Sequence, residues 1–198
     1  MATRSDRRIS AEEYLALERQ SETRNEFLDG EIFAMGGASR RHNLVTGNAF
    51  AALHAQLIGR DCEVHSSDLR VKVPATGLYA YPDVVVVCGG PQLEDDTHLD
   101  TLLNPTLIIE VLSPTTADYD RGGKFAHYRT LPSLAEYLVL AQDRVHAEHA
   151  SRQDDGSWLL TETSQPGEVL DLPSIGCRLD LKAVYARVLD APPATGGS

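Results

Sequence analysis

A short apolar stretch, LIIEVL at residues 107–112, carries a single acidic residue, Glu110, in its middle. Aliphatic residues on both sides of this position are typical of a strand that is buried on both faces of a sheet. A carboxylate in such a strand is costly to remove from water unless it meets a cation, a proton or a metal ion. The chain must therefore fold in a way that satisfies Glu110.

Other segments predict the elements around this strand. The runs YAYPDVVVVC (79–88) and EYLVLAQ (136–142) indicate further buried strands, and the helical spacing of apolar residues in 40–58 predicts a long helix. Helices mixed with strongly apolar strands favour an α/β (α+β) fold with a mixed central β-sheet flanked by helices. We expect one domain over residues 1–190, followed by a flexible tail at 191–198.

Local signals place the smaller elements. Ser10 and Glu13 have capping-box spacing for a short first helix, and Asp29-Gly30 predicts a tight hairpin, with a positive φ at Gly30. The stretch EVHSSDLRVKVP (63–74) alternates as a strand does. A second hairpin is expected about Asp155-Gly156, and a helix before Pro132.

Composition limits the classes of protein. The chain has 198 residues and a net charge of −11, which argues against a broad basic surface for nucleic acid. No apolar run is long enough to span a bilayer, and the first residues lack a signal-peptide pattern, so we expect a cytoplasmic protein. The three cysteines, Cys62, Cys88 and Cys177, are widely spaced in apolar contexts, which favours reduced packing residues over disulfides or a zinc site.

Two acids on apolar strands form the first candidate site. Asp83 follows Pro82 at the start of VVVVC, where it either caps a turn or stands at the mouth of the strand. Glu110 either forms a buried salt bridge or binds a cation. If the two strands are neighbours, the acids repel unless a cation lies between them, and a hard divalent ion with oxygen ligands serves that purpose.

Three further residues have both an ordinary and a functional interpretation. Lys124 lies four residues after Asp120 and is either a solvated helix residue or an amine that reaches back to the acids. Glu26, before the first hairpin, is either solvated or part of the metal site. His42, at the start of the long helix, is either a capping or core residue or an accessory group.

The order of several motifs resembles the Uma-two-type putative restriction endonucleases, a branch of the PD-(D/E)XK nuclease superfamily. The motifs are NEFLDGEIFAM, SRRHN, SSDLRV, YPDVVVVC, LIIEVLSPTT, DRGGKFAHYRTLPSLAEYLVL and LPSIG. The resemblance covers nearly the whole chain and implies a restriction-endonuclease-like core. It also implies hydrolysis of DNA by an enzyme that needs Mg²⁺ or Mn²⁺, and a homodimer.

The resemblance assigns roles to individual residues. It implies that Asp83, Glu110 and the backbone carbonyl of Val111 bind the metal, and that a lysine assists the attacking water. The usual lysine position, two residues after Glu110, holds Leu112, so the resemblance assigns that role to Lys124 on the next helix. Glu26 matches an acidic residue before the core sheet, and His42 matches a recurrent histidine.

Contact with the DNA backbone needs Lys or Arg side chains, and a chain of net charge −11 has fewer of these than of acidic residues. A catalytically silent scaffold that serves dimerisation or partner binding is therefore the alternative function, and a phosphoesterase for small substrates is a third. The residues that would contact DNA in a nuclease are Arg40, Arg41, Arg70, Lys72 and Arg121.

Overall fold

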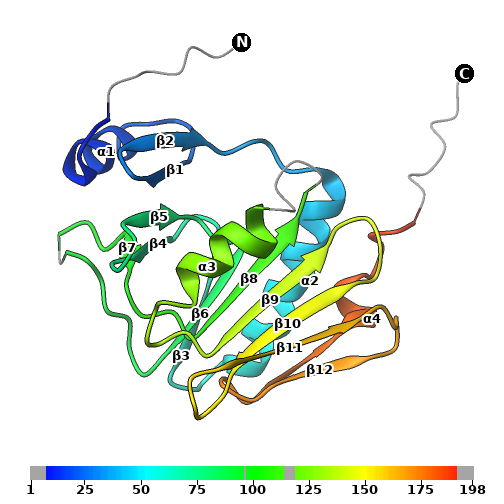
Figure 1. The fold of residues 1–198 in the computed structure, drawn as a ribbon. Coiled ribbons are helices and arrows are strands. Elements are labelled where there is room, and N and C mark those ends of the chain that lie inside the picture. The colour runs from blue at the N-terminus through cyan, green and yellow to red at the C-terminus, as the bar shows by residue number, and fades with distance from the viewer. Residues whose placement is uncertain (1–7, 96, 114–118, 191–198) are drawn as a thin grey trace, which may run out of the picture.

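A computed structural model describes residues 8–95, 97–113 and 119–190, and its largest element is a six-stranded mixed sheet (Figure 1). Strands β8 and β9 pair in parallel, whereas the other neighbours pair antiparallel. The predicted mixed sheet with flanking helices is thereby confirmed. Its strands are, in spatial order, β11 (Trp158–Thr163), β10 (Ala147–Arg152), β9 (Glu136–Ala141), β8 (Leu107–Leu112), β6 (Val84–Cys88) and β3 (Cys62–Ser66).

The central strands are apolar because both faces of this sheet are covered. Every residue of β8 and β9 is buried, Glu110 included. One face packs against α2 (Arg40–Leu57) and α4 (Leu181–Val184). The opposite face packs against Tyr128, Leu131 and a second sheet. Side chains alternate between these two faces along each strand.

The second sheet has five strands and carries the first hairpin. The turn between its first two strands has the predicted positive φ at Gly30 (83°), and Asp29 also has a positive φ (53°), because a two-residue hairpin turn twists in this sense. The order is β2 (Glu31–Ala34), β1 (Asn25–Leu28), β5 (Leu78–Ala80), β4 (Arg70–Val73) and β7 (Thr101–Leu102).

Two segments that were each expected to form one strand cross from one sheet to the other. Residues 63–74 divide into β3 and β4, and the amide of Leu69 donates to the carbonyl of Ser66 at the bend. Residues 79–88 divide into β5 and β6 on either side of Pro82, which has no amide to donate to a ladder. The second crossing places Asp83 between β5 and β6.

The first two helices begin where the sequence predicts. Ser10 and Glu13 form the expected capping box of α1 (Ala11–Glu18), and the Ser39 side chain caps α2. The predicted helix before Pro132 starts as a π-helix, η1 (Tyr119–Lys124), and continues as α3 (Phe125–Tyr128). A two-stranded sheet, β12 (Val169–Leu172) and β13 (Cys177–Asp180), leads into α4.

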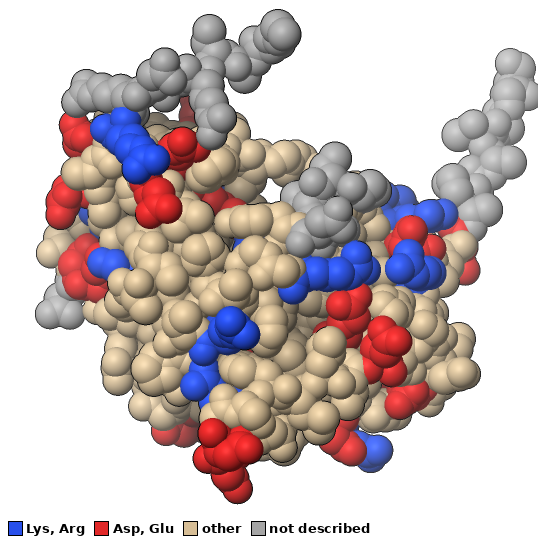
Figure 2. Space-filling view, viewed as in Figure 1, with Lys and Arg blue, Asp and Glu red and all other residues tan. Residues whose placement is uncertain are grey.

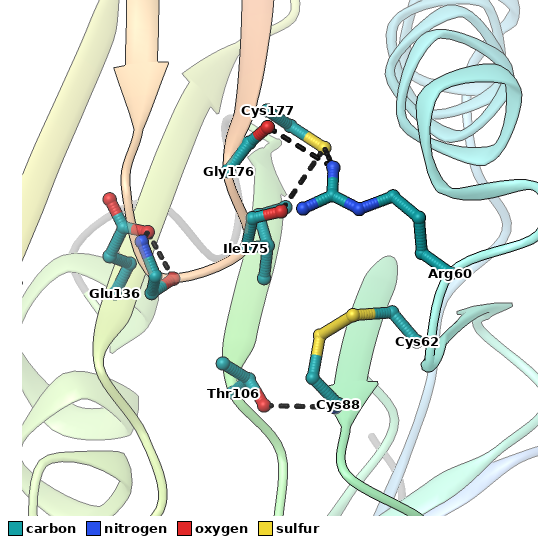
Figure 3. Close-up of a disulfide and its surroundings, with 9 residues drawn as sticks. Arg60, Cys62, Cys88, Thr106, Glu136, Ile175, Gly176 and Cys177 are labelled. Atoms are coloured by element: carbon teal, nitrogen blue, oxygen red, sulfur yellow. Dashed lines mark hydrogen bonds between the residues drawn. A yellow bond between two sulfur atoms is a disulfide. The ribbon is translucent and has the colours of Figure 1, made fainter.

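One cysteine prediction is wrong, because Cys62 and Cys88 form a disulfide (Figure 3). Cys62 begins β3 and Cys88 ends β6, and the antiparallel register places them directly opposite each other, with their Cα atoms 4.0 Å apart. Their separation of 26 residues conceals this pairing in the sequence. Cys177 is free and buried, as a packing residue would be.

The expected tail at 191–198 lies outside the described residues. Within the part of the chain that the structure describes, no helix has the length and apolar character needed to cross a membrane.

Candidate active site

Asp83 directly precedes β6, and Glu110 lies in the neighbouring strand β8. The antiparallel pairing of β6 with β8 ends with Val84 opposite Ile109, the residues next to Asp83 and Glu110 in the sequence. The amide of Val111 donates a hydrogen bond of 2.7 Å to Oδ2 of Asp83, which fixes this carboxylate against β8. The two acids that the sequence suggested are therefore brought together.

Glu110 finds a cation and a hydroxyl. Its Oε1 accepts hydrogen bonds from Nζ of Lys124 at 3.2 Å and from the hydroxyl of Tyr128 at 3.1 Å. Burial raises the pKa of the Glu110 carboxyl well above its ordinary value, and Asp83 raises it further, although the Lys124 charge opposes both. Charge at this position is thus costly and only partly balanced.

Lys124 stands between three carboxylates. Its Nζ lies 2.8 Å from Glu26, 3.2 Å from Glu110 and 3.5 Å from Asp120. Burial lowers the pKa of the Lys124 ammonium, but the charges of these carboxylates outweigh it and raise the pKa well above its usual value. The side chain therefore stays protonated at neutral pH and is suited to stabilise negative charge.

His42 contacts Asp83 from the first turn of α2. Its Nε2 lies 3.3 Å from Oδ2 of Asp83, and its buried Nδ1 finds no hydrogen-bond partner among the described residues. Burial lowers the pKa of the imidazole, but the hydrogen bond and charge of Asp83 outweigh burial and raise the pKa. His42 and the amide of Val111 thus both contact Oδ2 of Asp83.

These side chains line a cleft of about 950 Å³. Its walls come from the β1–β2 hairpin, the start of α2 and the C-terminal end of β8. Four carboxylates line it, those of Glu26, Asp83, Glu110 and Asp120, and its apolar lining includes Leu28, Phe33, Met35, Tyr81 and Tyr119. The lining of the cleft thus contains both carboxylates and apolar side chains.

The oxygen atoms at the cleft suit a hard cation. Among the described residues, no group of three or more His, Cys, Asp or Glu side chains could by itself hold a metal ion. A small divalent cation commonly uses one or two carboxylates and keeps several water ligands. The excess of carboxylates over Lys124 supplies the charge that such an ion needs, so Asp83 and Glu110 fit it.

The five cations that were expected to contact DNA are dispersed. Arg40 and Arg41 are exposed at the start of α2. Lys72 pairs with Glu94, and Arg121 pairs with Glu148 at 2.7 Å. On the face seen in Figure 2, basic and acidic groups are interspersed.

Arg70 has a structural role instead. Only 2% of the residue is exposed, and its guanidinium contacts Asp100 at 2.9 Å and the hydroxyl of Tyr81 at 2.8 Å. This burial argues against the predicted DNA contact. The burial of Arg70 is not predictable from the sequence, because an alternating strand pattern does not show that residues on both faces of β4 are buried.

Sequence reasoning did not assign Tyr128, Asp120 or Phe33 to the site. The four-residue spacing of Asp120, Lys124 and Tyr128 is a helical signal that could have found the first two, because it places all three on one helix face. Phe33 needs the hairpin register, which pairs it with Glu26.

The fold is similar to that of a solved protein. The structure superimposes on a crystal structure titled as a putative nuclease belonging to DUF820 from Anabaena variabilis ATCC 29413 with a TM-score of 0.74. The two chains are 17% identical, and the match covers 91% of this chain and 99% of the other. At this identity the likeness shows the fold.

The chain belongs to the Uma2 family, described as "Putative restriction endonuclease", whose model matches residues 11–182. The resemblance in the motifs is confirmed. Two relatives come from Synechocystis sp. (strain ATCC 27184 / PCC 6803 / Kazusa). "Uncharacterized protein slr1290" is 38% identical, and the match covers 90% of this chain and 92% of the relative. "Uncharacterized protein sll1609" is 40% identical, and the match covers 78% of this chain and 86% of the relative.

Proposed function

We propose that this protein is a metal-dependent endonuclease that hydrolyses phosphodiester bonds in DNA. The observation that carries the proposal is the placement of Lys124 within 3.5 Å of three carboxylates, on the floor of a cleft that Asp83 also lines. Family membership and the nuclease-like fold support the same reaction class.

Asp83 and Glu110, with the backbone carbonyl of Val111, would hold a Mg²⁺ or Mn²⁺ ion. When bound, such an ion polarises the scissile phosphate and lowers the pKa of a water molecule. The oxygen-only donor set favours these ions over zinc. The amide of Val111 and the imidazole of His42 contribute by keeping the Asp83 carboxylate in one orientation.

Lys124 supplies the positive charge near the reacting phosphate. It stays protonated, so we assign it to orient the water and to stabilise the charge that develops on phosphate, and not to accept a proton. Glu26 holds the ammonium at 2.8 Å from the side of the hairpin and sets its position. Its role in the reaction is therefore exerted through Lys124.

Binding of the DNA backbone requires cations outside the cleft. The exposed Arg40 and Arg41 lie beside His42 in the sequence and are the cations that we assign to the DNA backbone. A homodimer stays a prediction from the family resemblance.

Calorimetric titration with Mg²⁺ and Mn²⁺ tests the metal site. We expect binding to wild type, and its loss in Asp83→Asn/Glu110→Gln, because this double variant removes both carboxylates while keeping their size. The matched control is Asp143→Asn, which changes an exposed acid paired with Arg144. Equal binding by all three proteins would contradict the site, and absence of binding by wild type would favour the catalytically silent scaffold.

A further inference from the structure

The β1–β2 hairpin presents an aromatic ring to the cleft. Phe33 pairs with Glu26 across the antiparallel ladder, and paired residues project from the same face. Glu26 contacts Lys124 at 2.8 Å, so Phe33 belongs to the same cleft wall as a carboxylate that holds this lysine. It is 46% exposed and lines the cleft. Ile32 pairs with Phe27 on the other face of the hairpin.

A second ring reaches the same cleft from η1. Tyr119 is 40% exposed and its ring lies against the backbone of Gly123, where an added Cβ would come within 2.4 Å of Cδ2. Because Gly123 has no side chain, the Tyr119 ring can pack against its backbone. Burial raises the pKa of the Tyr119 hydroxyl, and the charge of Glu26 raises it further, so the hydroxyl stays neutral.

Charge in the cleft does not favour the backbone of a duplex. Of the described residues that line the cleft, only Arg24 and Lys124 are Lys or Arg. Lys124 is held by three carboxylates, and Arg24 pairs with Asp68 at 3.2 Å. The phosphates of duplex and single strand alike are attracted to cations, but only the unpaired bases of a single strand can also stack on aromatic rings such as those of Phe33 and Tyr119.

We propose that the cleft binds an unpaired nucleotide of DNA, whose base stacks on Phe33 and Tyr119 while its phosphate faces Asp83 and Glu110. The inference rests on the proposed function and names its substrate class, which is single-stranded or locally unpaired DNA. The bases of an intact duplex are stacked on one another, so they reach these rings only after extrusion.

Binding of oligonucleotides that contain 2-aminopurine tests this site, because stacking on an aromatic ring quenches the fluorescence of this base. The measurement uses the Asp83→Asn/Glu110→Gln variant in EDTA, which cannot cut the probe and repels phosphate less. We expect quenching and at least roughly tenfold tighter binding of the single strand than of the same sequence as a duplex.

Matched substitutions on each element locate the contact. In the same background, Phe33→Ala should weaken single-strand binding roughly tenfold, Phe33→Trp should retain it, and Ile32→Ala should leave it within twofold. Gly123→Ala should weaken it by displacing Tyr119, whereas Gly122→Ala adds a Cβ with nothing within 4 Å and should not. Equal binding of duplex and single strand, or equal effects of Phe33→Ala and Ile32→Ala, would overturn the inference.

Failure of the proposed function would look different. If metal-loaded wild type cuts no DNA while the stacking site binds single strands as expected, the nuclease proposal fails and the binding site stands. If wild type cuts duplex and single strand equally well and Phe33→Ala changes neither rate, the nuclease proposal stands and the stacking site fails.

Discussion

Lys124 is the residue on which the electrostatics of the cleft depend. Its ammonium is the counter-charge to Glu26, Glu110 and Asp120, at 2.8–3.5 Å from each. Removal of one partner of a buried ion pair destabilises a protein more than replacement of both partners by apolar residues, because the remaining charge is left without compensation. The residue should therefore matter both to the fold and to the reaction.

Lys124→Met should lower the free energy of unfolding by about 3 to 5 kcal/mol at neutral pH in EDTA, because three carboxylates lose their counter-charge. Mn²⁺ should restore part of this loss by supplying a cation, and DNA hydrolysis should fall about 100-fold or more. Thermal melts with and without Mn²⁺ check the stability effects. Lys182→Met, an exposed lysine, is the control, and equal melting of both variants would contradict this role of Lys124.

The buried acid Glu110 could be found from the sequence because a lone charge in an apolar strand always requires a partner. Lys124 could be proposed as that partner, since its helix follows the strand. Phe33 could not be found in this way, because its place beside Glu26 depends on the hairpin register and on what covers that face. An exposed aromatic residue in a strand has no pattern that separates a binding residue from a core residue.

At the scale of elements, an ion cluster ties α1 to the five-stranded sheet. Asp100 accepts from Nε of Arg19 at 2.8 Å and pairs with Arg70 at 2.9 Å. Burial raises the pKa of the Asp100 carboxyl, but the hydrogen bonds from Arg19 and the charge of Arg70 outweigh it and hold the pKa far below its ordinary value. Its carboxylate thus contributes stability only while it is ionised.

The sign of the pH dependence follows from this depressed pKa. The contribution of Asp100 is complete above the pKa of the unfolded chain, about 3.9, and is lost as pH falls toward the folded value. Asp100→Asn should therefore melt well below wild type at pH 7, and the difference should shrink below about pH 4. Asp68→Asn, which is exposed, should change little. A pH-independent difference would refute the electrostatic explanation.

Elements were predicted best where the signal is local. The capping box of α1 and the turn at Asp29-Gly30 are encoded within four residues, and both formed as expected. The division of 63–74 and 79–88 between two sheets was missed, because a strand pattern records burial on each face and not the identity of the neighbouring strand.

For the whole molecule, the disulfide is the covalent link between distant parts of the chain. The disulfide between Cys62 and Cys88 joins the edge strand β3 to β6. The segment between the two cysteines contains β4 and β5 of the five-stranded sheet. The sequence did not reveal it, since only the strand register brings these two cysteines together. Family membership, in contrast, was visible because motifs spread over nearly the whole chain keep their order.

Cys62→Ser/Cys88→Ser should lower the free energy of unfolding by about 3 kcal/mol, the loop-closure effect of a link across 26 residues. For a chain of this size the melting temperature should fall by roughly 6 to 12 °C. A reducing agent should shift wild type by a similar amount and leave the double variant unchanged. An equal shift of both proteins on reduction would place the effect elsewhere.

Hydrolysis of DNA itself is the most direct measurement of the central claim. Supercoiled plasmid and an end-labelled single strand are incubated with wild type or Glu110→Gln, in Mg²⁺, Mn²⁺ or EDTA, after both proteins are shown to be folded. We predict cutting by wild type only with a divalent ion, with the single strand cut faster, and none by Glu110→Gln. Absence of cutting by metal-bound wild type, or equal cutting by the variant, would contradict the account.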